Sequence, residues 1–149
     1  MEELNSRIGY NLYRTGMLFR REGLRFLKQY GITPEQWQVL MILSARGGQT
    51  QKQICECTLQ DAPTLSRTIS RMIRDGLVTA SKSKKDRRAV EIKLAKKGLS
   101  LVKKSVKSSR VYEHTDKLLS GFDEEKKKKL IELLNELRAC LEGSCGKKT

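Results

Sequence analysis

The sequence predicts a mainly α-helical fold with one small antiparallel β wing, and three observations support this. Apolar residues recur at helical spacing along most of the 149-residue chain. Two short runs with strand character, residues 77–80 and 91–94, flank a strongly basic segment, residues 81–90. An amphipathic basic helix, residues 62–75, directly precedes this hairpin. Together they predict a winged helix-turn-helix with additional helices at both ends.

The first two helices are expected from apolar spacing and capping residues. Residues 4–30 carry an apolar stripe at helical spacing, and Gly31 is expected to end that helix. Thr33 is expected to cap the second helix, with Pro34 at its first position and Gln36 completing a capping box. The second helix should be deeply buried, because it holds Trp37, Val39, Leu40, Ile42 and Leu43, and residues 47–48 end it.

The next two helices form the expected helix-turn-helix. Thr50 is expected to cap a short third helix that ends near Thr58, and Asp61 to cap the fourth, which tolerates Pro63 in its first turn. Gly76 ends the fourth helix. Its apolar face, at the i, i+4, i+7, i+8 spacing, comprises Leu65, Ile69, Met72 and Ile73.

After the wing, a fifth helix is expected from near Gly98 to about residue 119, and a sixth over residues 124–141. Residues 143–149 are expected to form a disordered tail. No apolar stretch approaches the roughly 18–20 residues that span a bilayer, and the N-terminus does not resemble a secretion signal. We therefore expect a cytoplasmic protein.

The charge balance favours an anionic partner. Lys and Arg number 31 against 17 Asp and Glu, a formal net charge of +14. Nucleic acid is the first candidate partner and an anionic membrane surface the second. Nothing indicates an enzyme, because the chain has no Gly-rich phosphate loop and no His paired with a nucleophile. We expect no cofactor and no metal.

Three segments resemble the MarR family of multiple-antibiotic-resistance regulators. Residues 32–40 (ITPEQWQVL) are similar to the family's second helix, and residues 64–78 (TLSRTISRMIRDGLV) to its recognition helix and exit. Residues 86–90 (DRRAV), followed by residues 94–98 (LAKKG), match the Asp-x-Arg wing signature and the Leu-x-x-x-Gly after it. The order and spacing of the three segments make the match specific.

The resemblance implies a homodimeric, sequence-specific transcriptional regulator that binds a pseudo-palindromic operator in double-stranded DNA. Within a single domain, residues 1–149, it assigns residues 33–97 to the winged helix-turn-helix. Residues 1–31 and 98–142 would supply the dimerisation helices. We expect a repressor relieved by a small aromatic or phenolic ligand. Two alternatives stay open: a thiol-based redox-responsive regulator and a nonspecific structural nucleic-acid-binding protein.

The candidate DNA contacts lie on the fourth helix and in the wing. Arg67 and Arg71 are one turn apart on its polar face and are expected to enter a groove. By resemblance, Arg88 is the minor-groove arginine and Asp86 its partner. The other wing cations are expected to contact phosphates, since five basic residues lie within seven positions. The full candidate set is Thr64, Ser66, Arg67, Ser70, Arg71, Lys82, Lys84, Lys85, Asp86, Arg87 and Arg88.

Other candidates concern a ligand and the thiols. A cleft near the first two helices would be lined by Tyr10, Tyr13, Arg14, Trp37 and Met41, although ordinary core packing explains Trp37 better. The chain has four thiols, at Cys55, Cys57, Cys140 and Cys145. We expect a structural role for them rather than redox sensing.

Three positions depart from the family pattern. Thr58 stands where an apolar core residue is common. Leu59 stands where the helix-turn-helix usually bends at Gly, and Ala95 replaces the usual cap before the fifth helix.

Overall fold

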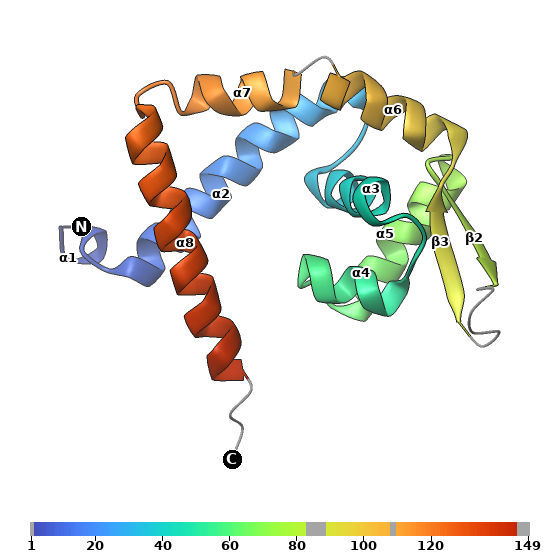
Figure 1. Ribbon diagram of the computed structural model, residues 1–149, viewed down its shortest axis with the longest axis horizontal. Coiled ribbons are helices and arrows are strands. Elements are labelled where there is room, and N and C mark those ends of the chain that lie inside the picture. The colour runs from blue at the N-terminus through green and yellow to red at the C-terminus, as the bar shows by residue number, and fades with distance from the viewer. Residues whose placement is uncertain (1, 83–88, 108–109, 146–149) are drawn as a thin grey trace. The chain divides into compact units, whose positions relative to one another are not determined.

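The computed structural model describes residues 2–82, 89–107 and 110–145, and the chain forms two compact units, Met1–Val111 and Tyr112–Thr149. The mainly helical prediction with a small antiparallel sheet is confirmed (Figure 1). The elements in chain order are α1 (Glu2–Asn5), α2 (Ile8–Leu27), the 3-10 turn η1 (Lys28–Tyr30), α3 (Pro34–Arg46), β1 (Gln49–Thr50), α4 (Gln51–Thr58), α5 (Ala62–Arg74), β2 (Val78–Lys82), β3 (Val90–Leu94), α6 (Lys96–Lys107), α7 (Arg110–Leu118) and α8 (Glu124–Cys145).

The first predicted helix is interrupted. Instead of one helix over residues 4–30, α1 stops at Asn5 and α2 starts at Ile8. The Ser6 hydroxyl donates to the Glu3 carbonyl oxygen (2.7 Å), and the Asn11 amide donates to the Asn5 carbonyl oxygen (2.7 Å). These side chains satisfy carbonyl groups that a continuous helix would use, so they compete with the helical ladder. Gly31 ends η1 as expected, at φ 67°.

The predicted caps are confirmed at three helices. The Thr33 and Gln36 side chains form a reciprocal capping box at α3, and Thr50 and Gln53 form another at α4. The Asp61 carboxylate caps α5. Such caps depend on residues a few positions apart, which is why the sequence alone identifies them.

The core of the first unit lies where α3, α4 and α5 meet the sheet. In α3, Val39, Leu40 and Leu43 are buried as predicted, whereas Trp37 and Ile42 are only half-buried against this core. In α5, Leu65, Ile69 and Met72 are buried. Ile73 was predicted to join them but is 43% exposed. It follows Met72 by 100° around the helix and so lies at the edge of the apolar stripe.

The sheet has three strands in the order β1-β3-β2, all antiparallel. The hairpin pairs Val78 with Leu94 and Lys82 with Val90, so its strands extend further toward the wing tip than predicted. Sequence analysis missed β1, because a two-residue strand has no periodicity to detect. Its Gln49 pairs with Ile92 of β3. Because α4 follows β1 directly in the chain, this pairing attaches the start of α4 to the sheet.

The C-terminal helices differ in their bounds. The fifth predicted helix corresponds to α6 and α7, and residues 108–109 between them lie outside the described residues. The predicted tail is too long by three residues, since α8 continues through residues 143–145. Gly143 does not end it, as a single glycine costs a helix only about 1 kcal/mol. None of the described helices is long and apolar enough to cross a bilayer.

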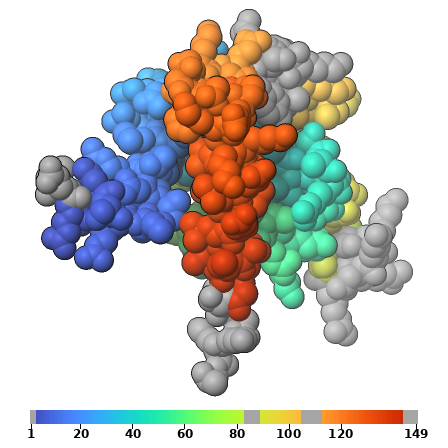
Figure 2. All heavy atoms as spheres, turned by 60° about the vertical axis from the view of Figure 1, so that its left-hand side comes forward, coloured from blue at the N-terminus to red at the C-terminus, as the bar shows by residue number. Residues whose placement is uncertain are grey.

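A stripe of large apolar side chains on α2 has no cover within its own unit. Ile8 is 71% exposed, and Leu12 and Phe19, which share its side of the helix, are 40% and 46% exposed. Figure 2 shows this N-terminal part of α2, in blue, standing at the molecular surface. A contiguous apolar surface of this kind marks a site of association.

Leu59 holds the turn between α4 and α5 in a left-handed conformation. Its φ is 56° and ψ 19°, and its side chain is 84% exposed. This backbone region costs an L-residue about 1–2 kcal/mol, and glycine avoids that cost. The departure from the family pattern therefore leaves the geometry of the turn intact at a cost in stability.

Replacing Leu59 with glycine is expected to raise the free energy of unfolding by about 1 kcal/mol, because the exposed leucine contributes almost no packing. Thermal melting should show a rise in Tm of roughly 2–4 °C. Leu59→Ala is the matched control, since it removes the same side chain but keeps the Cβ. An equal gain in both variants would contradict a backbone origin.

Candidate nucleic-acid interface

Three contacts fix the position of α5. The Thr64 backbone amide donates to Asp61 Oδ1 (2.8 Å) at the start of the helix. The Gln51 side-chain amide donates to the Ala62 carbonyl oxygen (3.0 Å), which joins α4 to α5. At the other end, Lys97 Nζ donates to the Asp75 carbonyl oxygen (2.9 Å). With Leu65 and Met72 fully buried, the opposite face of α5 is directed away from the core.

That outward face carries the predicted contact residues of this helix. Ser66, Arg67, Ser70 and Arg71 are exposed and follow one another at helical spacing, while Thr64 is half-buried. Among the described residues, no carboxylate lies within ion-pair distance of Arg67 or Arg71. Arg74, by contrast, has its Nε 3.7 Å from Asp75 Oδ1. The two arginines of the outward face are thus available to an external anion.

The wing is only partly described. Lys82 is exposed at the end of β2, opposite Val90 at the start of β3. The other predicted wing residues, Lys84, Lys85, Asp86, Arg87 and Arg88, lie outside the described residues. The last described pair of the hairpin, Lys82 and Val90, lies at the end that is remote from α6.

Asp61 is the acidic group of this surface with a shifted pKa. Its hydrogen bond from the Thr64 backbone amide, followed by the Thr64 side chain, lowers the pKa of the carboxyl, and the charge of Arg67 adds a smaller contribution. A lowered pKa means that Asp61 stabilises the fold above its unfolded-state pKa. This contribution is lost as the pH falls through the folded-state pKa.

Asp61→Ala is expected to lower Tm by roughly 2–5 °C at neutral pH, because α5 loses its cap. The difference from the unsubstituted protein should shrink at about pH 3, which lies below the unfolded-state pKa of about 3.9. Thermal melts at both pH values measure this. Asp61→Asn should keep most of the stability, since asparagine also caps helices. If Asp61→Ala lowered Tm equally at both pH values, the cap would not depend on the charged form of the carboxyl.

The predicted ligand residues lie on two helices, α2 and α3. On α2, Arg14 Nη1 donates to the Tyr10 hydroxyl oxygen (3.1 Å), and Tyr13 is 71% exposed. On α3, Trp37 and Met41 pack against the core. Helix α2 meets α3 further along its length, where Arg20 Nη2 is 2.9 Å from Glu35 Oε1.

The junction of α2 and α3 contains a hollow that sequence analysis missed. It measures about 370 Å³ and includes none of the predicted ligand residues. The hollow is lined by Leu24, Arg25, Lys28, Gly31 and Ile32.

The carboxyl of Glu35, at the start of α3, has a lowered pKa. Burial opposes its ionisation, but hydrogen bonds from its own backbone amide, the Thr33 hydroxyl and the Arg20 guanidinium, together with the charge of Arg20, hold the pKa below its ordinary value.

The described thiols are not disulfide-bonded. Cys55 is half-buried and packs against the core, in keeping with a structural role. Cys57 is exposed, and Arg46 Nη1 donates to its Sγ (3.0 Å). Cys140 is exposed on α8, and the side chain of Cys145 lies outside the description. In the part of the chain that the structure describes, no three metal-ligating side chains gather.

Comparison with known proteins identifies consistent relatives. A family model described as the MarR family matches residues 30–89. The homoprotocatechuate degradative operon repressor of Escherichia coli is 30% identical over 115 residues, which cover 76% of this chain and 75% of that repressor. The regulator BilQ of Clostridium symbiosum is 28% identical, over 74% of this chain and 76% of BilQ. These relatives regulate transcription, which agrees with the expectation that the chain is not an enzyme.

The fold also matches a solved regulator bound to DNA. The transcriptional repressor CouR, bound to a 23-mer DNA duplex, superposes with a TM-score of 0.83 over 91% of this chain and 95% of CouR. At 24% sequence identity, this match concerns the fold. The winged-helix architecture expected from the sequence is confirmed.

Proposed function

The chain belongs to the MarR family of winged-helix transcriptional regulators, and we propose that it is a homodimeric repressor of a pseudo-palindromic operator, released by a small aromatic or phenolic ligand. Residues 33–97 would form its DNA-binding part. One observation carries the proposal: the outward face of α5 presents Arg67 and Arg71, exposed and without a carboxylate in ion-pair distance among the described residues. A helix of this width fits the major groove of B-DNA.

The proposed contacts divide into two kinds. Ser66, Arg67, Ser70 and Arg71 on α5 would read base edges or hold phosphates in the major groove, with Thr64 near the phosphates at the helix start. Lys82 and the wing cations would contact the backbone, and Arg88, oriented by Asp86, would enter the minor groove. CouR, which shares the fold, is bound to a DNA duplex, and this supports the proposal.

The dimer is proposed from exposed apolar surface. Besides the stripe on α2, helix α8 exposes Ile131 and Leu133 by 60% and 50%. Full burial of such a side chain is worth roughly 1.5–3 kcal/mol, and the exposed part of each forfeits its share of that free energy. We therefore propose that residues 1–31 and 98–142 supply the dimerisation helices, with their exposed apolar side chains in the subunit interface. Two recognition helices would then lie about one helical turn apart on the DNA, near 34–36 Å.

Selection of binding sites from random DNA with the purified protein tests the proposal. The selected sequences should be pseudo-palindromic, and light scattering in solution should give twice the chain mass. In competition titrations, scrambled duplex should bind about 10³-fold or more weakly than the selected operator. A ratio near one would show a nonspecific structural nucleic-acid-binding protein instead.

The proposed ligand would bind near Tyr10, Tyr13 and Arg14 of α2, with Trp37 and Met41 of α3. Its effect on operator affinity should be roughly 5–150-fold. Salicylate and other phenolic acids are suitable probes in the operator titration. A phenolic ligand that shifts the operator affinity of the unsubstituted protein but not of an Arg14→Ala variant would support this site.

A thiol-based response is the alternative function. The exposure of Cys57 favours it, because its sulfur, which accepts a hydrogen bond from Arg46, is accessible to an oxidant. Operator binding should then be lost on peroxide treatment and kept in Cys57→Ser. An unchanged peroxide response after replacing all four cysteines with serine would eliminate this alternative.

A further inference from the structure

Both ends of α5 are hydrogen-bonded by side chains from elements that adjoin strand β3 of the wing. At the start, Gln51 Nε2 donates to the carbonyl oxygen of Ala62, the first residue of α5 (3.0 Å). At the exit, Lys97 Nζ donates to the carbonyl oxygen of the C-cap residue, Asp75 (2.9 Å). A cation is also favoured there by the helix dipole. We call Gln51 and Lys97 the α5 anchors.

Strand β3 connects the two anchors. Gln51 directly follows β1, which pairs with β3 through Thr50 and Glu91. Lys97 is the third residue after β3 and lies in the first turn of α6. Strand β3 also forms the wing hairpin with β2. The same strand therefore positions both anchors and the wing, so that α5 and the wing are joined at both ends of the helix.

The anchors act on the tilt of α5 rather than on its attachment to the core. Leu65 and Met72 are fully buried, and apolar contacts of this kind attach the helix but have no preferred direction. A hydrogen bond is directional, and it weakens outside a donor–acceptor distance of about 2.7–3.2 Å. The anchors hold opposite ends of a helix of 13 residues, which is roughly 20 Å long. Constraints this far apart oppose rotation of α5 on the core.

A small tilt of α5 would move the arginines of its outward face. Arg67 is eight residues from Asp75, which corresponds to about 12 Å along the helix. If the Gln51 bond were lost and α5 pivoted about its exit by roughly 5°, Arg67 would move by about 1 Å. A hydrogen bond to a base edge does not tolerate that displacement, whereas the attraction of a guanidinium to phosphate changes little. The anchors therefore affect base reading more than attraction to the DNA backbone.

We propose that Gln51 and Lys97 are positioning residues that determine the sequence specificity of operator binding, acting through Arg67 and Arg71 on α5. This role rests on the proposed function, since it assumes that α5 reads an operator. Gln51 is half-buried and Lys97 is exposed, so the loss of either hydrogen bond has little effect on stability. Their contribution to specificity can therefore be measured in folded variants.

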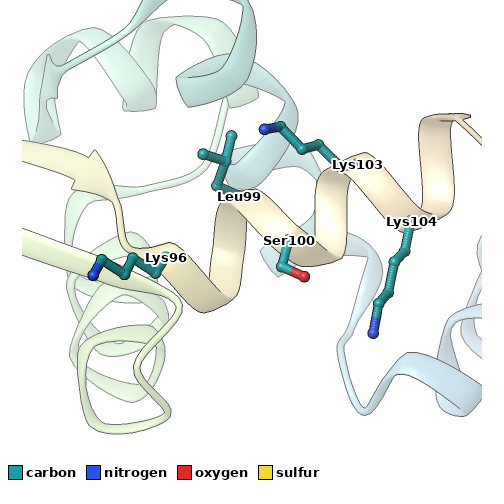
Figure 3. Close-up of a pocket in the computed structure, with 5 residues that line it drawn as sticks. All are labelled: Lys96, Leu99, Ser100, Lys103 and Lys104. Atoms are coloured by element: carbon teal, nitrogen blue, oxygen red, sulfur yellow. The ribbon is translucent and has the colours of Figure 1, made fainter.

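The test replaces each anchor with methionine, which keeps the length of the side chain but cannot donate a hydrogen bond. Gln29→Met is the control for Gln51→Met, because Gln29 Nε2 donates to the Phe26 carbonyl oxygen (2.9 Å) outside the proposed DNA-binding part. Lys96→Met is the control for Lys97→Met, because it removes the same charge from the adjacent residue of α6. Figure 3 shows Lys96 at the start of this helix. Lys97→Arg keeps a cationic donor at the anchor.

Fluorescence anisotropy gives the affinities for the selected operator and for scrambled duplex, and their ratio measures specificity. Gln51→Met and Lys97→Met should each lower this ratio by about 10-fold or more. Gln51→Met should bind scrambled duplex as the unsubstituted protein does, and Lys97→Met should bind it as Lys96→Met does. Lys97→Arg and both controls should keep the ratio of the unsubstituted protein. Thermal melting should give a Tm within about 3 °C for every variant.

Two results would overturn the proposal. If the anchor variants kept the specificity ratio, neither residue would position α5 for base reading. An equal fall of the ratio in the controls would show a general effect of substitution. The ratio of the unsubstituted protein is measured first, and a value near one would instead contradict the proposed function, so the two failures are distinguishable.

Discussion

Replacing Gly98 with alanine is expected to lower the free energy of unfolding by about 3 kcal/mol, at the upper end of the usual cost of overpacking. A Cβ at this position would overlap the Leu77 carbonyl oxygen and come within 3.1 Å of its carbonyl carbon and 3.3 Å of Leu40 Cδ2. The Leu77 carbonyl cannot move away easily, because it also accepts the Ala95 backbone amide (3.0 Å). The added methyl group must therefore separate α6 from the start of the wing.

Denaturant unfolding measures the free energy of unfolding of Gly98→Ala. The comparison variant carries the same substitution at a helical glycine that has open surroundings. At Gly9 on α2, an added Cβ would meet no heavy atom within 4 Å, so Gly9→Ala should stabilise the protein by about 0.5–1 kcal/mol through helix propensity. A loss of stability in Gly98→Ala together with a gain in Gly9→Ala would show that close packing, and not helix propensity, determines the effect at position 98. If Gly98→Ala were as stable as the unsubstituted protein, α6 would not pack against Leu77 as closely as the structure indicates.

Sequence patterns identified the features of this fold that depend on neighbouring residues. The caps at Thr33, Thr50 and Asp61 involve short spacings, and the structure gives each a local physical role. The break after Asn5 was missed, although its cause is equally local. The apolar periodicity over residues 4–30 predicted one continuous helix, and the hydrogen bonds of the Ser6 and Asn11 side chains with backbone carbonyls were not considered.

The candidate site was predictable to different extents. The outward face of α5 follows from helical spacing, since Leu65, Ile69 and Met72 fix which side is buried. The link between Lys97 and the Asp75 carbonyl joins residues 22 positions apart, and no periodic pattern predicts such a contact. The proposed ligand cleft depends on how α2 and α3 approach each other, which apolar content alone does not determine.

The double substitution Arg67→Ala/Arg71→Ala is expected to weaken operator binding by about 10²–10⁴-fold, because each well-formed base contact contributes about 1–3 kcal/mol. Both side chains are exposed, and the helix that carries them is held by other residues. The free energy of unfolding should therefore change by less than about 0.5 kcal/mol. Fluorescence anisotropy with the selected operator and with scrambled duplex measures the change.

Comparing the two duplexes distinguishes base reading from backbone attraction. If Arg67 and Arg71 read bases, the double variant loses more affinity for operator than for scrambled DNA, and its specificity ratio falls. If they hold phosphates, both affinities fall together and the salt slope drops by about 0.9 for each arginine. Lys126→Ala/Lys128→Ala, which removes two charges from α8, is the control. An operator affinity as high as that of the control would exclude both roles and leave the outward face of α5 as a solvated surface.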